Sequence, residues 1–355
     1  MSQIASGDTH LEENRKPTDQ AAPSKDGTDA RQKLSALYAP VAGQLAAVET
    51  ILQSELSSDT PFVKQLLEHS WLMGGKRMRP VLLLLSGLAI AKPEIDAQHE
   101  LNLMGAAIEM IHTATLVHDD VLDKADLRRH QPTANAKWDN RVSVLLGDYL
   151  FTHAFHIGSK SGSAAALGKL AAASNLVCAG EMKQNYHAGN FEIDQSVYFE
   201  VVTQKTADLC AAACGIGAML AGGNETVIDE FENYGRDLGI AFQIIDDVLD
   251  LVGTAEDVGK TLGTDLSNAK ATLPIIHCLK TLSADQRLEF LDVLNTGTDV
   301  ARAVDLLEST NSIQYARQVA QQHASRAEAF AKSLPQNEAS QSLVKLAQFT
   351  LERSH

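Results

Sequence analysis

The sequence has few basic residues, few aromatic residues and few cysteines for its length. Among 355 residues, 30 are Lys or Arg and 45 are Asp or Glu, so the formal net charge is −15. A general nucleic-acid binder needs a basic face, and this charge argues against that class. Anionic ligands could bind only where positive charge is concentrated or where metal ions intervene. The four cysteines form no CxxC pair, so we expect buried free thiols instead of a zinc site.

Long apolar runs are also missing. The longest, residues 81–91, is well short of the roughly 20 residues that a membrane-spanning helix needs, and we expect a buried core helix there. Residues 1–31 lack the apolar region of a signal peptide and have little to bury. We therefore expect residues 1–31 to be a disordered tail, residues 32–355 to form one domain, and the protein to be cytoplasmic.

Strand signals are nearly absent, because no Asn-Gly or Asp-Gly turn separates alternating apolar runs. No proline occurs between Pro132 and Pro274, and a helix interior rejects proline at a cost of about 3 kcal/mol. The same stretch is rich in Ala, Leu and Met at helical spacing. These features predict an all-α fold, one large bundle of ten or more helices. Breaks are expected at residues 57–61, 74–75, 92–93, 128–134, 222–223 and 254–267.

The pentapeptide DDVLD occurs twice, ending once at Asp123 and once at Asp250. Residues four apart share a helix face, so Asp119 lies on the face of Asp123. Asp246 lies on the face of Asp250 for the same reason. A solvated acidic face would explain either motif alone, but both have apolar flanks and both are followed by basic residues. Carboxylates that face inward on two helices need cations.

The choice of cation follows from the ligand type. All-carboxylate ligation suits a hard ion. The loop pattern of a calcium EF-hand is missing, and Glu109-x-x-His112 is a single motif where a di-iron bundle needs two. Magnesium holds few protein ligands and shares its shell with water and phosphate oxygens. Two facing aspartate clusters are therefore predicted to hold several Mg²⁺ ions around a diphosphate.

Basic residues are concentrated at positions that could balance such a ligand. The segment LMGGKRMRP places Lys76, Arg77 and Arg79 after two glycines, although a helix C-cap followed by surface bases would explain it alone. His112 lies about two helical turns before Asp119 and shares its face; a hydrogen-bonded core histidine is the alternative. Further bases that complete the set are Arg128, Arg129, Lys205, Lys260 and Lys270.

Together these motifs resemble those of the trans-isoprenyl diphosphate synthases, most closely the long-chain, octaprenyl-type polyprenyl diphosphate synthases. The resemblance runs from about Gln32 to the C terminus and rests, in order, on GGKRMRP, HTATLVHDDVLDKADLRR, GDYLF, KTA, FQIIDD, GKTLGTDL and TLP. It implies a helical bundle of the isoprenoid synthase type with a central cavity. It implies a prenyltransferase that condenses isopentenyl diphosphate head-to-tail with an allylic diphosphate. It also implies a homodimer without membrane insertion or nucleic-acid binding.

The resemblance also implies a role for each matching residue. Three Mg²⁺ ions, for which Mn²⁺ can substitute, would be held by Asp119, Asp123 and Asp246, supported by Asp120, Asp247 and Asp250. The allylic diphosphate would be bound by Arg128, Lys205 and Lys260, and isopentenyl diphosphate by Lys76, Arg79, His112 and Arg129. The oxygens of Thr206 and Gln243 would lie beside the allylic diphosphate and face a developing carbocation. The expected catalytic set is Lys205, Thr206 and Gln243.

Product length is predicted from the side chains before the first aspartate motif. In this family a large aromatic residue there blocks the growing chain early, whereas Ala114 and Thr115, with Ile111, would leave the tunnel open. We therefore expect a C30–C40 product, octaprenyl-like, for quinone side-chain or related isoprenoid biosynthesis. A farnesyl or geranylgeranyl product is the alternative. Phe151 and Phe155 are the expected floor of the tunnel.

Three other classes of protein share some of these features. A class I terpene cyclase shares the fold and the first motif, but it normally lacks a second DDxxD, and only 5% of this chain is aromatic. A non-catalytic subunit of a heteromeric synthase tends to lose aspartates or bases, and here both sets are present. A helical metal-storage protein would not need the basic set. The sequence favours the synthase.

Overall fold

The computed structural model describes residues 25–72, 75–129, 131–252, 269–296 and 299–352. The first half of this chain forms α1 (Lys25–Tyr38), η1 (Ala39–Val41), α2 (Ala42–Glu55), α3 (Pro61–Leu72), α4 (Met78–Ala89), α5 (Gln98–Leu122), α6 (Ala134–Lys137), α7 (Asn140–Ser159) and α8 (Ala164–Tyr186). The second half forms α9 (Gln195–Val202), η2 (Thr203–Ala207), α10 (Asp208–Leu220), α11 (Glu225–Val252), α14 (Leu273–Thr281), α15 (Ala284–Thr296), α16 (Val300–Ser309), α17 (Ser312–Ser333) and α18 (Glu338–Glu352). The expected all-α class, with more than ten helices, is confirmed.

Two strands occur that the sequence did not predict. β1 (Leu127–Arg128) and β2 (Gln131–Pro132) pair antiparallel, with Arg128 opposite Gln131. Strands of two residues are too short to show alternation, so no sequence pattern announces them. The hairpin lies in the break expected at 128–134 and turns the chain back after α5.

Most of the predicted boundaries hold. The breaks expected at 57–61, 92–93 and 222–223 lie between helices, whereas 254–267 lies outside the described residues. Residues 1–24 of the expected tail also lie outside them. Helix α1 begins at Lys25, so the expected domain boundary at residue 31 falls inside a helix. Within the described part, no helix combines the length and apolar character needed to cross a membrane.

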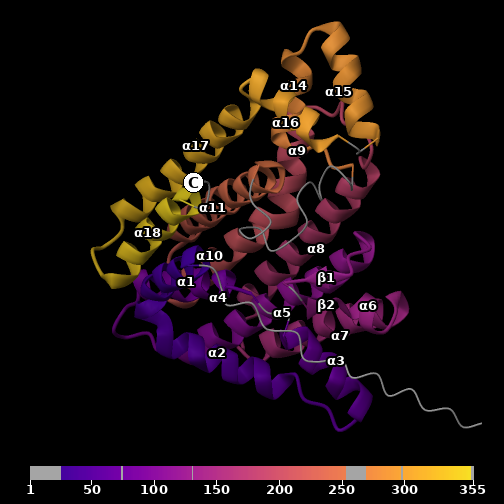
Figure 1. Ribbon diagram of the computed structural model, residues 1–355. Coiled ribbons are helices and arrows are strands. Elements are labelled where there is room, and N and C mark those ends of the chain that lie inside the picture. Colours follow the sequence, from indigo (N-terminus) through magenta and orange to yellow (C-terminus); the bar gives the residue numbers. More distant parts are fainter. Residues whose placement is uncertain (1–24, 73–74, 130, 253–268, 297–298, 353–355) are drawn as a thin grey trace, which may run out of the picture.

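The centre of the bundle is built from α4, α5, α10 and α11. Figure 1 shows α5 in the interior, with α17 and α18 along one flank, and α5 packs against α7 while α11 packs against α10 and α17. The predicted core helix in the apolar run is confirmed, since α4 is buried from Pro80 to Gly87. Gly217 of α10 lets the two helices approach closely, because a Cβ there would lie 2.1 Å from the carbonyl oxygen of Leu83.

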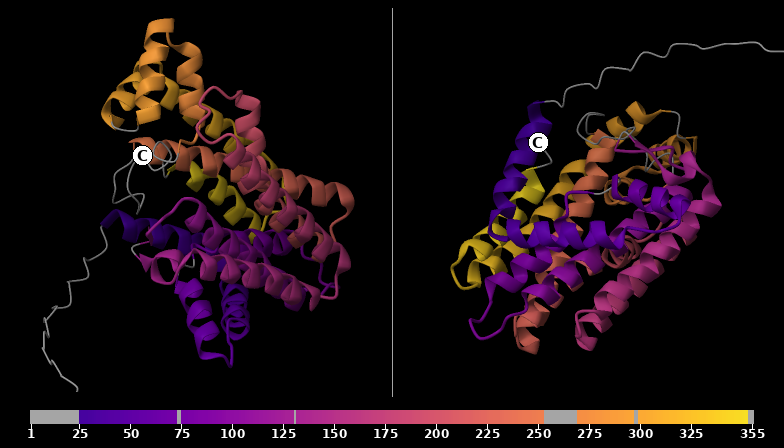
Figure 2. Two further views of the ribbon diagram at one scale, coloured as in Figure 1. Left: turned by 90° about the vertical axis from the view of Figure 1, so that its right-hand side faces the viewer. Right: turned by 90° about the horizontal axis from the view of Figure 1, so that it is seen from below.

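Helices α14, α15 and α16 project from one end of the bundle, as Figure 1 and the left view of Figure 2 show. They have a small core of their own around Phe290 and Leu307, separate from the main one. Long helices therefore enclose the centre of the molecule, and the two DDVLD segments lie on two of them, α5 and α11.

Candidate active site

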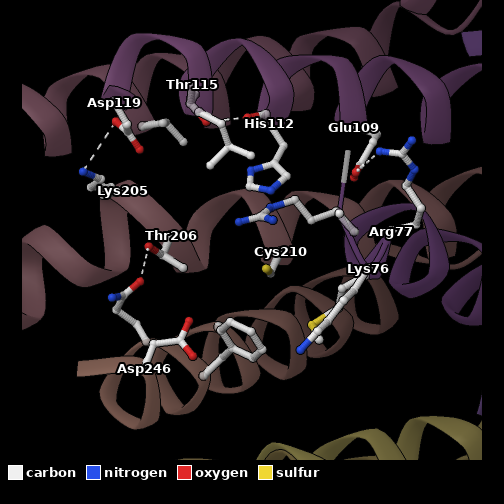
Figure 3. A pocket seen from close by; sticks show the side chains of 18 of the residues that line it. Lys76, Arg77, Glu109, His112, Thr115, Asp119, Lys205, Thr206, Cys210 and Asp246 are labelled. Carbon is white, nitrogen blue, oxygen red and sulfur yellow. Dashed lines mark hydrogen bonds and ion pairs between the residues drawn. The ribbon is translucent and has the colours of Figure 1, made fainter. Parts of the chain in front are cut away.

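A cavity of about 1570 Å³ lies between α5, α8, η2, α11 and the start of α4. Figure 3 shows α5 along one side, with Asp119 and His112 facing it, and Asp246 on the opposite wall. Both aspartate motifs therefore reach one cavity. Fourteen of the predicted site residues line it: Lys76, Arg79, His112, Thr115, Asp119, Asp123, Arg128, Arg129, Lys205, Thr206, Gln243, Asp246, Asp247 and Asp250.

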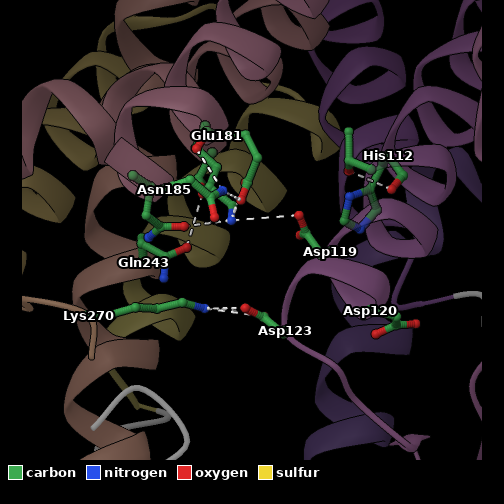
Figure 4. Close-up of polar contacts among 12 residues, drawn as sticks. His112, Asp119, Asp120, Asp123, Glu181, Asn185, Gln243 and Lys270 are labelled. Carbon is green, nitrogen blue, oxygen red and sulfur yellow. Dashed lines mark hydrogen bonds and ion pairs between the residues drawn. The ribbon is translucent and has the colours of Figure 1, made fainter. Parts of the chain in front are cut away.

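The first motif ends a helix. Asp119 and Asp120 lie in the last turn of α5, Asp123 is its C-cap, and no basic residue of this helix lies in that turn. The C-terminal end of a helix carries partial negative charge, so three carboxylates there need cations nearby. Lys205 Nζ lies 3.7 Å from Asp119 Oδ1, and Lys270 Nζ lies 3.1 Å from Asp123 Oδ1 (Figure 4). The middle residue of the motif, Asp120, turns away from the cavity.

Asp120 is 1% exposed and pairs with Arg128. Arg128 donates from Nε and from Nη2 to Asp120 Oδ1, each over 2.8 Å. Because Arg128 also belongs to β1, this buried pair ties the short hairpin to the end of α5. Asp120 does not line the cavity, so any support it gives to the neighbouring aspartates is indirect.

The second motif lies within the last two turns of α11. Asp246 is half-buried and faces the cavity, while Asp250 and Asp247 are 6% and 5% exposed. Both oxygens of Asp247 accept hydrogen bonds, one from Tyr198 Oη at 2.7 Å and one from Gln243 Nε2 at 2.8 Å. Thr206 Oγ1 donates to Gln243 Oε1 over 3.0 Å. These contacts join α9, α11 and η2 around one end of the cavity.

Lys205 and Thr206 stand on a π-helical turn, η2, in which Asp208 N–H bonds back to the Thr203 carbonyl. Such turns are rare and often occur at functional sites. Two glycines let the neighbouring helices press against it. A Cβ on Gly180 would lie 2.6 Å from Lys205 N, and one on Gly239 would lie 2.6 Å from Ala207 Cα. Close packing from α8 and α11 therefore holds the turn, and any side chain at either glycine would displace it.

Glu181 of α8 is a cavity carboxylate that no sequence motif indicated. It forms an ion pair with Lys205, which also donates to Gln184 Oε1 over 2.8 Å. Burial raises the pKa of Glu181, Lys205 lowers it, and nearby Asp119 raises it. Glu181 and Gln184 lie three residues apart on one helix, so their spacing could have indicated them as a pair. Their partner Lys205 comes from another element, and no spacing along the helix points to it.

Basic side chains gather at the other end of the cavity. Lys76, Arg79, His112 and Arg129 all line it. Arg129 lies against the backbone of Gly75, where a Cβ would meet its Nη2 at 2.7 Å. Arg79 Nε is buried and has no hydrogen-bond partner among the described residues. An orphaned donor of this kind, aimed at a cavity, indicates a missing anionic or polar ligand.

Arg77 belongs to the same basic segment but plays a different part. It has φ 53°, in the left-handed region, and acts as N-cap residue of α4. Its Nε donates to Glu49 over 2.6 Å and its Nη1 to Glu109 over 3.0 Å, and its guanidinium lies 4.6 Å from the Trp71 ring. Arg77 therefore anchors the start of α4 to α2 and α5, and so positions its basic neighbours.

His112 is held neutral. Burial, followed by the charges of Arg79, Arg129, Arg128 and Arg77, holds its pKa well below the usual range. A neutral imidazole can both donate and accept a hydrogen bond. His112 lines the cavity, so a ligand there can reach its imidazole.

Only some of the predicted tunnel residues line the cavity. Thr115 and Phe151 line the cavity, whereas Ala114 and Ile111 are fully buried in the helix packing. Phe155 packs against Phe151, with 5.9 Å between ring centroids, and does not line the cavity. The wall before the first aspartate is thus formed by Thr115 and, one residue on, Leu116.

Two further expectations concern Lys260 and the cysteines. Lys260 lies outside the described residues. The expectation of buried thiols is wrong for Cys178, which is exposed and lines the cavity, and holds for the other three cysteines. Within the described ranges, no three His, Cys, Asp or Glu side chains gather closely enough to hold a metal ion by themselves.

The model of a family described as Polyprenyl synthetase matches residues 60–309. An octaprenyl diphosphate synthase from Haemophilus influenzae is 33% identical over 85% of this chain and 92% of its own. A short chain isoprenyl diphosphate synthase from Methanothermobacter thermautotrophicus is 35% identical over 81% of this chain and 89% of its own. A heptaprenyl diphosphate synthase component 2 from Geobacillus stearothermophilus is 35% identical over 91% of this chain and 100% of its own.

Among solved structures, a polyprenyl synthase from Caulobacter crescentus complexed with calcium and isoprenyl diphosphate superposes with a TM-score of 0.84. It is 33% identical and covers 91% of this chain and 98% of its own.

Proposed function

Since this chain belongs to the polyprenyl synthetase family and is a prenyltransferase, we propose that it is a long-chain trans-polyprenyl diphosphate synthase. The proposed reaction condenses isopentenyl diphosphate head-to-tail with an allylic diphosphate. The single observation that carries this proposal is the cavity, with aspartates of α5 and α11 at one end and Lys76, Arg79 and Arg129 at the other. Two diphosphate groups would thus have separate places, one among the aspartates and one among the arginines.

The donor set supports magnesium at the aspartate end. Asp119, Asp123 and Asp246 offer only carboxylate oxygens, the ligands that hard divalent ions prefer. The carboxylates of the α5 pair already attract cations, since Lys205 and Lys270 place ammonium groups 3.7 and 3.1 Å from their oxygens. Divalent ions would complete their shells with water and diphosphate oxygens, which fits the spread of ligands over two helices. Bound Mg²⁺ would stabilise the negative charge on the leaving diphosphate.

The protein groups act by binding and orientation. Lys205 and Arg128 would bind the allylic diphosphate with charge-assisted hydrogen bonds, and Arg79, His112 and Arg129 would bind isopentenyl diphosphate. The allylic C–O bond breaks, and its electron pair leaves with the diphosphate. The isopentenyl double bond then gives its electron pair to the allylic carbon, and a proton passes to the departing diphosphate. Thr206 and Gln243 would place oxygen atoms beside the transient positive charge.

A long product is the finer part of the proposal. The cavity volume of about 1570 Å³ exceeds the range of about 300–1,000 Å³ that is usual for small-ligand pockets. Thr115 and Leu116 leave no aromatic ring on the wall directly before Asp119. A C30–C40 product fits this space, with Phe151 as a candidate floor. A shorter farnesyl or geranylgeranyl product is the second candidate, favoured by the similarity to the short-chain synthase from Methanothermobacter.

We further propose a homodimer formed through α7 and α8. Of the eleven large hydrophobic side chains that are exposed in the described part of the chain, four lie on these two helices outside the cavity: Leu145, Tyr149, Leu176 and Tyr186. Apolar surface of this kind on adjoining helices is typical of a contact between chains. The similarity to a heptaprenyl synthase component 2 makes a different partner chain the competing outcome.

The test is an incubation of the purified protein with farnesyl diphosphate, labelled isopentenyl diphosphate and Mg²⁺, followed by chromatography of the products. Metal-dependent chains of C30–C40 would support the proposal, and C15 or C20 products would favour the second candidate. Light scattering of the same sample distinguishes a dimer from a monomer. A folded monomer that elongates no primer would point to a subunit that needs another chain.

A further inference from the structure

A chain of three hydrogen bonds runs from the protein interior to the cavity wall. It starts at Tyr198 of α9, which is 4% exposed and does not line the cavity. Its hydroxyl donates to Asp247 Oδ2, Gln243 Nε2 donates to Asp247 Oδ1, and Thr206 Oγ1 donates to Gln243 Oε1, over 2.7, 2.8 and 3.0 Å. Figure 3 shows the last link beside Asp246. A buried tyrosine is thereby connected to two side chains of the proposed reaction centre.

This arrangement gives the Gln243 amide a single orientation. An ionised carboxylate only accepts hydrogen bonds, so the amide NH₂ must face Asp247 and the amide oxygen must face Thr206. Thr206 donates its one hydroxyl proton to Gln243, which leaves the lone pairs of Thr206 Oγ1 free to face the cavity. An oxygen that presents lone pairs stabilises positive charge, whereas one that presents a proton would oppose it.

Tyr198 supports this arrangement from behind. Its hydroxyl meets the second oxygen of Asp247, a carboxylate that is only 5% exposed. A buried carboxylate that loses one donor turns to regain it, because an unmet charge in the interior is costly. Turning Asp247 would release the Gln243 amide, and with it the direction of the Thr206 hydroxyl.

We propose that Tyr198 is a positioning residue for the condensation, acting through Asp247 to orient Gln243 and Thr206 toward the developing carbocation. This inference rests on the proposed prenyl transfer and deepens it. Within the second DDVLD segment, it assigns Asp246 to the cavity and Asp247 to the orientation of the catalytic amide. Neither the repeated motif nor the spacing of Tyr198 from it indicates this division.

The matched pair of variants is Tyr198→Phe and Tyr234→Phe. Tyr234 is equally buried on α11, and its hydroxyl donates to the Leu343 carbonyl over 2.8 Å, away from the cavity. Both variants lose one buried hydroxyl and one hydrogen bond. Tyr198→Phe is expected to lower kcat by about tenfold or more, since small misplacements of catalytic groups have large effects, with KM for both substrates within about twofold. Tyr234→Phe is expected to lower thermal stability and to keep kcat.

A double-mutant cycle with Asp247→Asn supplies the second readout. If Tyr198 acts through Asp247, adding Tyr198→Phe to Asp247→Asn lowers kcat by much less than it does in the wild type. Should Tyr198→Phe fail to fold, Asp247→Asn alone is expected to reproduce the loss of kcat at unchanged KM.

Equal kcat for the two Tyr→Phe variants in an active enzyme would overturn the inference and leave the proposed function intact. Fully additive losses in the cycle would also overturn it. A folded wild type that forms no prenyl product with any primer would overturn both.

Discussion

The two DDVLD segments contain the same five residues and have different surroundings. On α5 the motif ends the helix, and basic side chains from three other segments meet its carboxylates, with Arg128 buried against Asp120. On α11 the helix continues past the motif to Val252, and the middle aspartate is hydrogen-bonded by neutral groups, Tyr198 and Gln243. The middle aspartate therefore holds a loop in one motif and orients an amide in the other.

The difference shows that a repeated ligand motif need not have repeated internal roles. In both segments the first aspartate faces the cavity, because both helices present that face to the same space. The second aspartate is buried in both segments, although Asp247 also lines the cavity, and its function depends on which neighbours the fold supplies. Ion pairs with basic side chains contribute on the α5 side. Hydrogen bonds from neutral groups and close packing contribute on the α11 side.

The largest effects are expected where the two motifs agree. Asp119→Asn and Asp246→Asn should each lower kcat/KM by about 100-fold or more, as removal of one transition-state electrostatic contact does. Steady-state kinetics at several Mg²⁺ concentrations provides the measurement. Asp229→Asn, an exposed position on α11 outside the cavity, is the control and should keep full activity. Normal turnover in either cavity variant would contradict the shared role of the two motifs.

A second prediction concerns the close packing on the α11 side. Gly239→Ala places a Cβ that would lie 2.6 Å from Ala207 Cα, so η2 must move away with Lys205 and Thr206. We expect kcat to fall by about tenfold to 100-fold, because reacting groups tolerate little displacement.

Gly168→Ala on α8 is the control for this packing prediction, since a Cβ there meets nothing within 4 Å. The Gly239 variant should remain folded by circular dichroism. Equal kcat in the two glycine variants would show that η2 is not held by this contact.

A third prediction separates two aspartates of the α5 motif by their contribution to stability. Asp120→Ala leaves Arg128 buried without its carboxylate and should lower the free energy of unfolding by about 3 kcal/mol or more. Asp123→Ala removes a more exposed pair with Lys270 and should cost less than about 1 kcal/mol. Urea unfolding of both variants provides the comparison. Similar costs would mean that the α5 motif is not held by its buried ion pair.

The smallest effect is expected from His112, which has no counterpart on α11. Its pKa in the folded protein is well below the usual range, because of burial and four arginines. As the pH falls, the unfolded chain, with an ordinary histidine pKa of about 6.5, therefore binds a proton at this position at a higher pH than the folded protein does. The contribution of neutral His112 to stability is complete above about pH 6.5 and is lost as the pH falls below it.

His112→Gln should therefore lose less stability between pH 8 and pH 5.5 than the wild type. Urea midpoints of the substrate-free proteins at the two pH values measure this difference. The carboxylates contribute equally to both proteins, so a parallel loss in wild type and variant would exclude His112 as the source.

Local patterns predicted much of the site because the information lies within single helices. The four-residue spacing was enough to place Asp119 and Asp123 on one side, and the glycines before Lys76 were enough to place a break there. Contacts between distant segments could not be predicted in this way. Glu181 meets Lys205 across two elements, and Tyr198 meets Asp247 from 49 residues away in the sequence. The two strands were not predicted, because a strand of two residues is too short to show a period.

The helical class, the two acidic helix faces and the positions of the basic segments can be predicted, because each depends on spacing along one helix or on composition. Which partners each carboxylate meets depends on the packing of distant segments. Side-chain direction is fixed by packing between helices, where one glycine such as Gly239 sets a backbone distance. That is why Asp120 on α5 and Asp247 on α11, the middle residues of two identical pentapeptides, have different partners.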